Sequence, residues 1–150
     1  MNATDLCRRY VDAWNSHDAE AILGCFALDG RYEDPITGGP ISGAQLKAHA
    51  QRLWRAFPDL AFEAETPIAS PPDRVAVGWT MSGTNLGRYL GATQTGGRVS
   101  MRGMALLRCA PEGIAAATAT SIPLSCRGNS ASRWSCSLRG SARSSAARAA

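Results

Sequence analysis

Hydrophobic residues recur at helical spacing near the start of the chain. Over residues 4–15, spacings of three and four give one apolar stripe, made of Leu6, Tyr10, Ala13 and Trp14. The polar run after Asn15 interrupts this stripe, and Asp18 is suited to cap a second, short helix. Ile22, Leu23 and Phe26 are expected to face inward from that second helix.

A third helix is predicted after residue 42. Ser42 and Gln45 have the spacing of a capping box, in which the side chain of each residue accepts a hydrogen bond from the backbone N–H of the other. The apolar face that follows has helical spacing and consists of Leu46, His49, Ala50, Leu53 and Phe57. Pro58 ends the pattern, because proline lacks the amide hydrogen that a helix interior needs.

Strands are predicted over residues 31–34, 60–65, 74–82 and 98–108. The alternation is clearest in the third of them, where Val75, Val77, Trp79 and Met81 alternate with smaller or more polar neighbours. The Gly-rich segment 83–97 is too long for a tight turn, and we expect it to form a loop at the mouth of a site. This order of elements predicts an α+β fold, with helices packed on one curved antiparallel sheet.

The composition changes near residue 112. Residues 1–112 contain eleven Lys/Arg and twelve Asp/Glu, whereas residues 113–150 contain five Arg and no acid, so the net charge of +4 comes from the last quarter. Neither sheet nor helix periodicity persists in that Ser/Ala/Arg-rich tail. We therefore expect one domain over 1–112. The tail is a disordered basic arm, a surface-binding arm, or a segment translated out of frame.

Reading possible codons of the tail in another frame supports the out-of-frame interpretation. With suitable third bases, residues 117–123 read in another frame give Tyr-Ser-Asp-Ile-Asp-Pro. On this interpretation, which we favour, the last strand of the sheet is missing or altered. A sheet without that strand would expose an edge, which predicts a marginally stable or aggregation-prone chain.

Other classes of site find little support in the sequence. Two histidines and five cysteines without a C-x-x-C pair argue against a metal centre or a disulfide framework. Glycine-rich phosphate loops and the serine elbow are absent, so we expect no cofactor and no metal. The nearly neutral charge of residues 1–112 argues against nucleic acid. A charged amino terminus without long apolar runs predicts a cytoplasmic protein with no membrane partner.

Asp34 is the candidate with the most distinctive chemistry. Alternation places it on the same strand face as Tyr32, where apolar surroundings would raise its pKa and suit it to remove a proton next to a carbonyl. The other interpretation is that Asp34 caps the turn that begins at Pro35, and the pattern alone favours this one.

Tyr10 and His49 each allow a structural and a functional interpretation. A buried Tyr10 is either an ordinary core residue or a donor to a developing oxyanion. His49, among leucines on the third helix, is either a core histidine or part of a pocket. The same choice between core and pocket wall applies to the large aromatic residues Trp14, Trp54, Phe57 and Trp79.

The opening of the chain resembles the ketosteroid isomerases of the nuclear-transport-factor-2-like superfamily. The resemblance is carried by RRYVDAWNSHDAEAILGCFALDGRYEDPITGGPISG. It implies a cone-shaped fold in which Tyr10 donates to the oxyanion and Asp34 is the base. The second oxyanion donor of that family, an aspartic acid, would fall near Met104, where this chain has no acid.

The middle of the chain resembles the SnoaL-like polyketide cyclases, which share the cone. This resemblance is carried by AFPDLAFEAE and by WTMSGTNLGRYLGATQTGGRVSMRGMALLR. It implies ring closure by deprotonation of a carbon acid without a cofactor. The base of those enzymes is an aspartate on the last strand, and no acid follows Gly113 in this chain. The family also implies a homodimer if the last strand is intact.

Together these observations predict a cofactor-free isomerase or cyclase acting on a hydrophobic polyketide or steroid-like ketone. Asp34 and Tyr10 are the expected catalytic residues. The expected substrate-binding residues are Trp14, Tyr32, His49, Trp54, Phe57 and Trp79. Two alternatives remain open: an epoxide-opening hydrolase on the same fold, and a non-catalytic cone that binds a small molecule or a protein.

Overall fold

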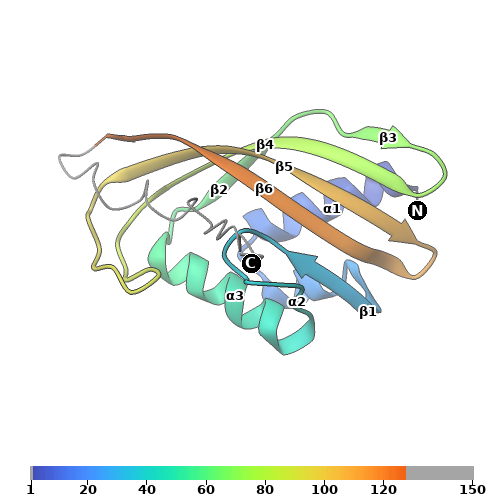
Figure 1. The fold of residues 1–150 in the computed structure, drawn as a ribbon, viewed down its shortest axis with the longest axis horizontal. Coiled ribbons are helices and arrows are strands. Elements are labelled where there is room, and N and C mark those ends of the chain that lie inside the picture. Colours follow the sequence, from blue (N-terminus) through green and yellow to red (C-terminus); the bar gives the residue numbers. More distant parts are fainter. Residues whose placement is uncertain (1, 128–150) are drawn as a thin grey trace, which may run out of the picture.

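The computed structural model describes residues 2–127, the last six of them by their backbone alone. Three helices lie against one face of a curved sheet (Figure 1). In chain order the elements are α1 (Ala3–Asn15), α2 (Ala19–Leu23), β1 (Phe26–Glu33), α3 (Gly43–Ala56), β2 (Ala61–Ala64), β3 (Ile68–Ser70), β4 (Arg74–Thr84), β5 (Arg98–Ala110) and β6 (Gly113–Arg127). The expected α+β architecture is confirmed.

The helix starts follow the local sequence, with one exception. Asn2 caps α1 by accepting from the Asp5 amide, and the Asp18 side chain caps α2 by accepting from the amides of residues 20 and 21. The helix α3 begins after Ser42 as predicted, but the Ser42 side chain makes no capping hydrogen bond. The predicted capping box is therefore wrong in its bonds, although it locates the start of the helix.

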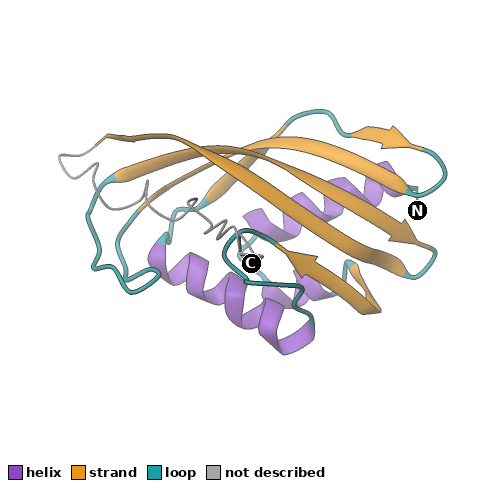
Figure 2. Cartoon of the chain, viewed as in Figure 1, coloured by secondary structure: helices purple, strands orange, loops and turns teal. Residues whose placement is uncertain are grey.

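The sheet has the order β1-β6-β5-β4-β2, and β3 pairs with the first residues of β4. The pair β1 and β6 is parallel, and the other pairs are antiparallel. Three strands are longer than the pattern predicted, because β1 begins at Phe26 rather than at residue 31, β4 continues to Thr84 and β5 continues to Ala110. The strand β3 was not predicted. Figure 2 shows the long strands curving over the helices.

A last strand is present, contrary to the expectation that it is missing. Residues 113–127 form β6, which lies between β1 and β5, so the sheet has no exposed edge at this place. The strand forms because both neighbours supply backbone partners and because its small side chains fit, with Ile114 and Ala117 buried. The expected boundary at residue 112 thus falls inside the sheet.

Part of the expectation about the tail is untouched by this correction. The strand carries no acid, whereas the resemblance to the SnoaL-like cyclases implies an aspartate on it. Residues 128–150 lie outside the described residues. Translation in another frame is a property of the coding DNA, and it stays a prediction that sequencing the gene would test.

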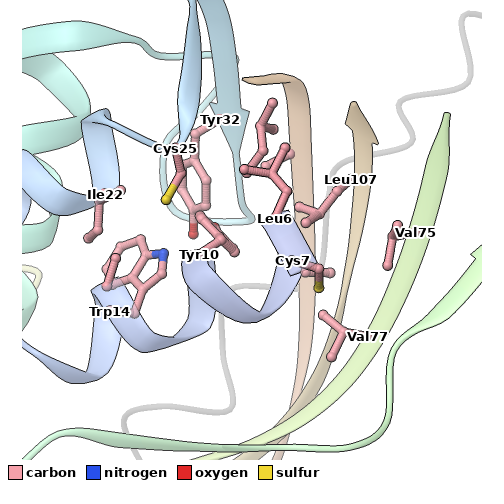
Figure 3. Close-up of a cluster of buried hydrophobic side chains, with 14 of the residues drawn as sticks. Leu6, Cys7, Tyr10, Trp14, Ile22, Cys25, Tyr32, Val75, Val77 and Leu107 are labelled. Carbon is pink, nitrogen blue, oxygen red and sulfur yellow. The ribbon is translucent and has the colours of Figure 1, made fainter. Parts of the chain in front are cut away.

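The core fills the space between α1 and the sheet. All four residues of the predicted α1 stripe are buried, together with Cys7. Figure 3 shows Tyr10 and Trp14 projecting from α1 toward Tyr32, while Val77 and Leu107 approach from the sheet. This packing holds α1 against the strands. A cavity lies beside this part of the core.

Candidate active site

A cavity of about 90 Å³ lies between the helices and the concave face of the sheet. Six of the eight predicted site residues line it: Tyr10, Trp14, Tyr32, Asp34, His49 and Trp79. They come from α1, β1, α3 and β4, so the cavity depends on the whole fold rather than on one segment. Most of its walls are aromatic or aliphatic, and the polar side chains among them include one carboxylate, Asp34, and one imidazole, His49.

Asp34 follows directly after β1 and uses its two oxygens differently. Oδ1 accepts from the backbone amides of Ile36, at 2.8 Å, and Thr37, at 2.9 Å, and so holds the turn after the strand. Oδ2 accepts from the Tyr32 hydroxyl at 2.9 Å and lies 2.9 Å from Nε2 of His49. Asp34 therefore caps the turn with one oxygen and belongs to the cavity cluster with the other.

The expectation that burial would raise the pKa of Asp34 is wrong. Burial does favour the neutral acid, and it is the largest single influence on this carboxyl group. The hydrogen bond from His49, the charge of that ring when it is protonated, the amide of Ile36 and the hydroxyl of Tyr32 together outweigh it, because all of them stabilise the carboxylate. The pKa of Asp34 is consequently lowered, and the group is an anion at neutral pH.

His49 lies on the buried face of α3, with its side chain only 4% exposed. Its Nε2 is directed at Oδ2 of Asp34, whose side chain is 12% exposed. A carboxylate can only accept, so Nε2 carries a hydrogen and donates it. The two residues, 15 apart in the sequence, form a buried carboxylate–imidazole pair at the wall of the cavity.

Three tyrosines surround this pair. Burial raises the pKa of Tyr10 and of Tyr32 far above the ordinary value. Burial, and then the charge of Asp34, raise the pKa of Tyr89 to about 12. All three phenols therefore keep their hydrogen at neutral pH. The Tyr32 hydroxyl donates to Asp34, and Tyr10 is the phenol of the cavity wall that matches the expected oxyanion donor.

Two predicted substrate-binding residues do not line the cavity. Trp54 stacks on His17 with ring centroids 5.1 Å apart and packs edge-to-face on Trp14. Phe57 packs in a second apolar cluster with Leu60 and Met81. The helical spacing placed Phe57 on the inner face of α3, and Trp54 was expected there as a large aromatic residue of core or pocket wall. The cavity reaches only the part of that helix around His49 and Leu53.

The cavity also has walls that the sequence reasoning missed. Among them are Phe62, Met101, Tyr89, Ala119 and Ser121. Tyr89 belongs to the segment 83–97, whose glycines marked it as a mouth loop, so a search for aromatic residues in that loop would have found it. Ala119 and Ser121 lie in the segment assigned to the tail, and no signal in the pattern pointed to them.

The two positions at which the resemblances imply an acid have other residues in this chain. Met104 is 53% exposed and does not line the cavity. On the last strand, the inward residues next to the cavity are Ala119 and Ser121. Among the side chains that the structure describes, Asp34 is therefore the carboxylate that reaches the cavity.

Residues 2–121 contain no group of three or more His, Cys, Asp or Glu side chains arranged to hold a metal ion. No helix within the described part of the chain is long and apolar enough to cross a membrane.

Comparison with protein families identifies a match over residues 4–120 to the model of the SnoaL-like polyketide cyclases. The chain belongs to the SnoaL-like polyketide cyclase family. The match continues past residue 112 into β6, in agreement with the position of that strand inside the sheet. The resemblance seen in the sequence is thus confirmed.

Solved structures of similar fold support this assignment. AclR of Streptomyces galilaeus, a candidate hydroxylase, is 28% identical with a TM-score of 0.69, over 79% of this chain and 73% of its own. IdmH of Streptomyces antibioticus, a candidate polyketide cyclase, is 22% identical with a TM-score of 0.70, over 81% and 92%.

A protein of ketosteroid isomerase-like fold from Catenulispora acidiphila, solved with trimethylamine, is 18% identical with a TM-score of 0.65, over 79% and 85%. Comparison with curated proteins finds no match. The family and the cone fold are therefore established by similarity, and the reaction has to be argued from the site.

Proposed function

We propose that this protein is a cofactor-free isomerase or cyclase that removes a proton next to the carbonyl of a hydrophobic ring ketone. The observation that carries the proposal is the buried pair of Asp34 and His49 at the wall of an aromatic cavity. A hydrogen-bonded carboxylate and imidazole form a base that can accept one proton in a site with little water. The homodimer and the cytoplasmic location stay predictions.

The reaction is redox-neutral, so this chain's own residues can supply what the step requires. The carbon–hydrogen bond next to the carbonyl breaks, the proton passes to the pair, and the bonding electrons move to the carbonyl oxygen. Tyr10, protonated and buried, donates a hydrogen bond to that oxygen as negative charge develops on it. The pair then returns the proton at another carbon, or the enolate carbon attacks a second carbonyl and closes a ring.

The walls favour a flat, apolar substrate. Trp14, Phe62 and Trp79 stand in edge-to-face contact, with Phe62 in the middle, and all three line the cavity. Aromatic surfaces of this kind bind ring systems through apolar contact. A volume of about 90 Å³ is small beside the roughly 300–1,000 Å³ of ordinary ligand pockets, so binding of a ring system requires side chains to move aside.

The experiment is deuterium incorporation next to the carbonyl of a panel of one-, two- and four-ring ketones in heavy water, followed by proton NMR. The wild-type protein is expected to catalyse exchange in at least one of them. Asp34→Asn should lower that rate by roughly 10²- to 10⁴-fold, the usual contribution of a general base. Asparagine retains an oxygen for the amides of Ile36 and Thr37, so the turn should survive.

Glu33→Gln provides the matched control, because Glu33 is the neighbouring carboxylate and does not line the cavity. Its exchange rate should equal that of the wild type. Full exchange in Asp34→Asn would remove Asp34 from the mechanism. If the wild-type protein binds these ketones but exchanges no proton in any of them, the chain is a binding module and the proposal fails.

A further inference from the structure

The hydrogen bonds of Asp34 leave its carboxylate without a free acceptor position. A carboxylate oxygen offers two lone pairs, and each oxygen of Asp34 already accepts two hydrogen bonds. Two of these bonds come from backbone amides that hold the turn, and the others come from Tyr32 and His49. A substrate proton could reach this carboxylate only after one of the bonds broke.

His49 is in the opposite situation. Because Nε2 donates to Asp34, the neutral ring carries its free lone pair on Nδ1. Nδ1 has no hydrogen-bond partner among the residues whose side chains are described, and the ring belongs to the cavity wall. The arrangement therefore presents an available nitrogen lone pair next to a carboxylate that is fully occupied.

We propose that Nδ1 of His49 is the atom that receives the substrate proton, and that Asp34 is a positioning residue that acts through His49. This inference rests on the proposed proton abstraction and specifies its base. Asp34 keeps the hydrogen on Nε2, orients the ring, and stabilises the imidazolium that forms. Tyr32 supports the same arrangement, because its hydroxyl donates to the Asp34 oxygen that faces His49.

The proton transfer balances within this pair. The carbon–hydrogen bond of the substrate breaks, the proton bonds to Nδ1, and the electron pair remains on the substrate as an enolate. His49 is then a cation whose Nε2 hydrogen bond to Asp34 becomes charge-assisted. Return of the proton from Nδ1 to another substrate carbon restores the neutral ring, so no proton has to reach bulk water.

The first test reads the position of the hydrogen on His49 directly. The full chain is labelled with ¹⁵N-histidine, and its imidazole nitrogens are observed by NMR at the pH of the exchange assay. Only two histidines are present, and His17→Gln assigns them. The expected result is a hydrogen on Nε2 of His49 and none on Nδ1. A ring with hydrogen on Nδ1, or on both nitrogens, overturns the inference.

The same spectrum in Asp34→Asn distinguishes positioning from a merely structural role. The amide NH₂ of asparagine can donate to Nε2, and this should move the ring hydrogen to Nδ1 and remove the lone pair there. An unchanged hydrogen position in a folded Asp34→Asn protein contradicts the role assigned to Asp34.

The second test compares exchange rates of ring ketones in two histidine variants. His49→Gln can still donate to Asp34 but cannot accept a proton, so its rate should fall by at least about 100-fold. His17→Gln, outside the cavity, should keep the wild-type rate. Exchange retained in His49→Gln and lost in Asp34→Asn would make Asp34 the base, which overturns this inference and leaves the proposed function intact. Absence of exchange in the wild-type protein would instead contradict the proposed function.

Discussion

Asp34 combines two tasks that the sequence presents as alternatives. One oxygen caps the turn at residues 36–37, and the other joins the cluster around His49. The sequence could identify the residue, because an acid on the Tyr32 face of a strand end is unusual. It could not give the direction of the pKa shift, since that depends on His49, which approaches from a different element.

Because the pKa of Asp34 is lowered in the folded protein, its contribution to stability has a definite pH dependence. The stabilisation is fully present above the ordinary carboxyl value of 3.8 and is lost as the pH falls below it toward the folded pKa. The difference in the free energy of unfolding between wild type and Asp34→Asn, measured with urea, should therefore be largest near neutral pH. This difference should become smaller in acid.

Asp29→Asn, at an exposed position of the same strand, controls for the general effect of acid on the protein. A gap between wild type and Asp34→Asn that stays constant through the acid range would show that the folded and unfolded states bind protons at Asp34 equally.

At the scale of elements, the sequence predicts the helices and strands in which hydrophobic residues recur at a regular spacing, and it misses those without such a spacing. The stripe of α1 and the alternation of β4 gave their elements within two residues. The first part of β1, all of β3 and all of β6 were missed. Leu28 is fully exposed on β1, and the first half of β6 is rich in Ala and Thr, so neither β1 nor β6 alternates between apolar and polar side chains in the sequence.

A glycine on β5 determines how a tryptophan on β4 lines the cavity. Gly103 pairs with Trp79 across β4 and β5, and the indole ring lies over the place where a side chain at 103 would stand. A Cβ there would overlap the ring of Trp79 and the carbonyl oxygen of Thr120. Glycine at this position therefore allows Trp79 to lie flat against the sheet and line the cavity.

Gly103→Ala should accordingly displace Trp79 and lower the free energy of unfolding by about 1–3 kcal/mol, the usual cost of overpacking. Thermal unfolding and the quenching of tryptophan fluorescence by a bound ring ketone would measure the two effects. Gly24→Ala is the control, because Gly24 has an ordinary helical φ of -65° and more room. An unchanged unfolding temperature and unchanged ketone binding in Gly103→Ala would mean that Trp79 does not depend on this contact.

At the scale of the whole molecule, β6 joins two parts of the sheet that are otherwise separate. It is parallel to β1, which leads directly into Asp34, and antiparallel to β5, which carries Gly103. The change of composition at residue 112 led to the expectation of a domain over 1–112 whose last strand is missing or altered. A composition boundary marks where the sequence pattern changes, whereas strand pairing is decided by the neighbours that need a partner.

The position of β6 predicts that a chain ending at residue 112 does not fold cooperatively. It would lose the partner of β1 and one partner of β5, and also the buried Ile114 and Ala117. With β1 no longer paired to β6, the turn at Asp34 would lose the strand that places it beside His49. Circular dichroism during heating should show a gradual change rather than a sharp transition, and the exchange of ring ketones should be absent. A chain ending at residue 127 keeps every described strand and should retain both the sharp transition and the exchange. A sharp transition in the shorter chain would show that residues 1–112 form a complete fold, with β6 added to a sheet that is stable without it.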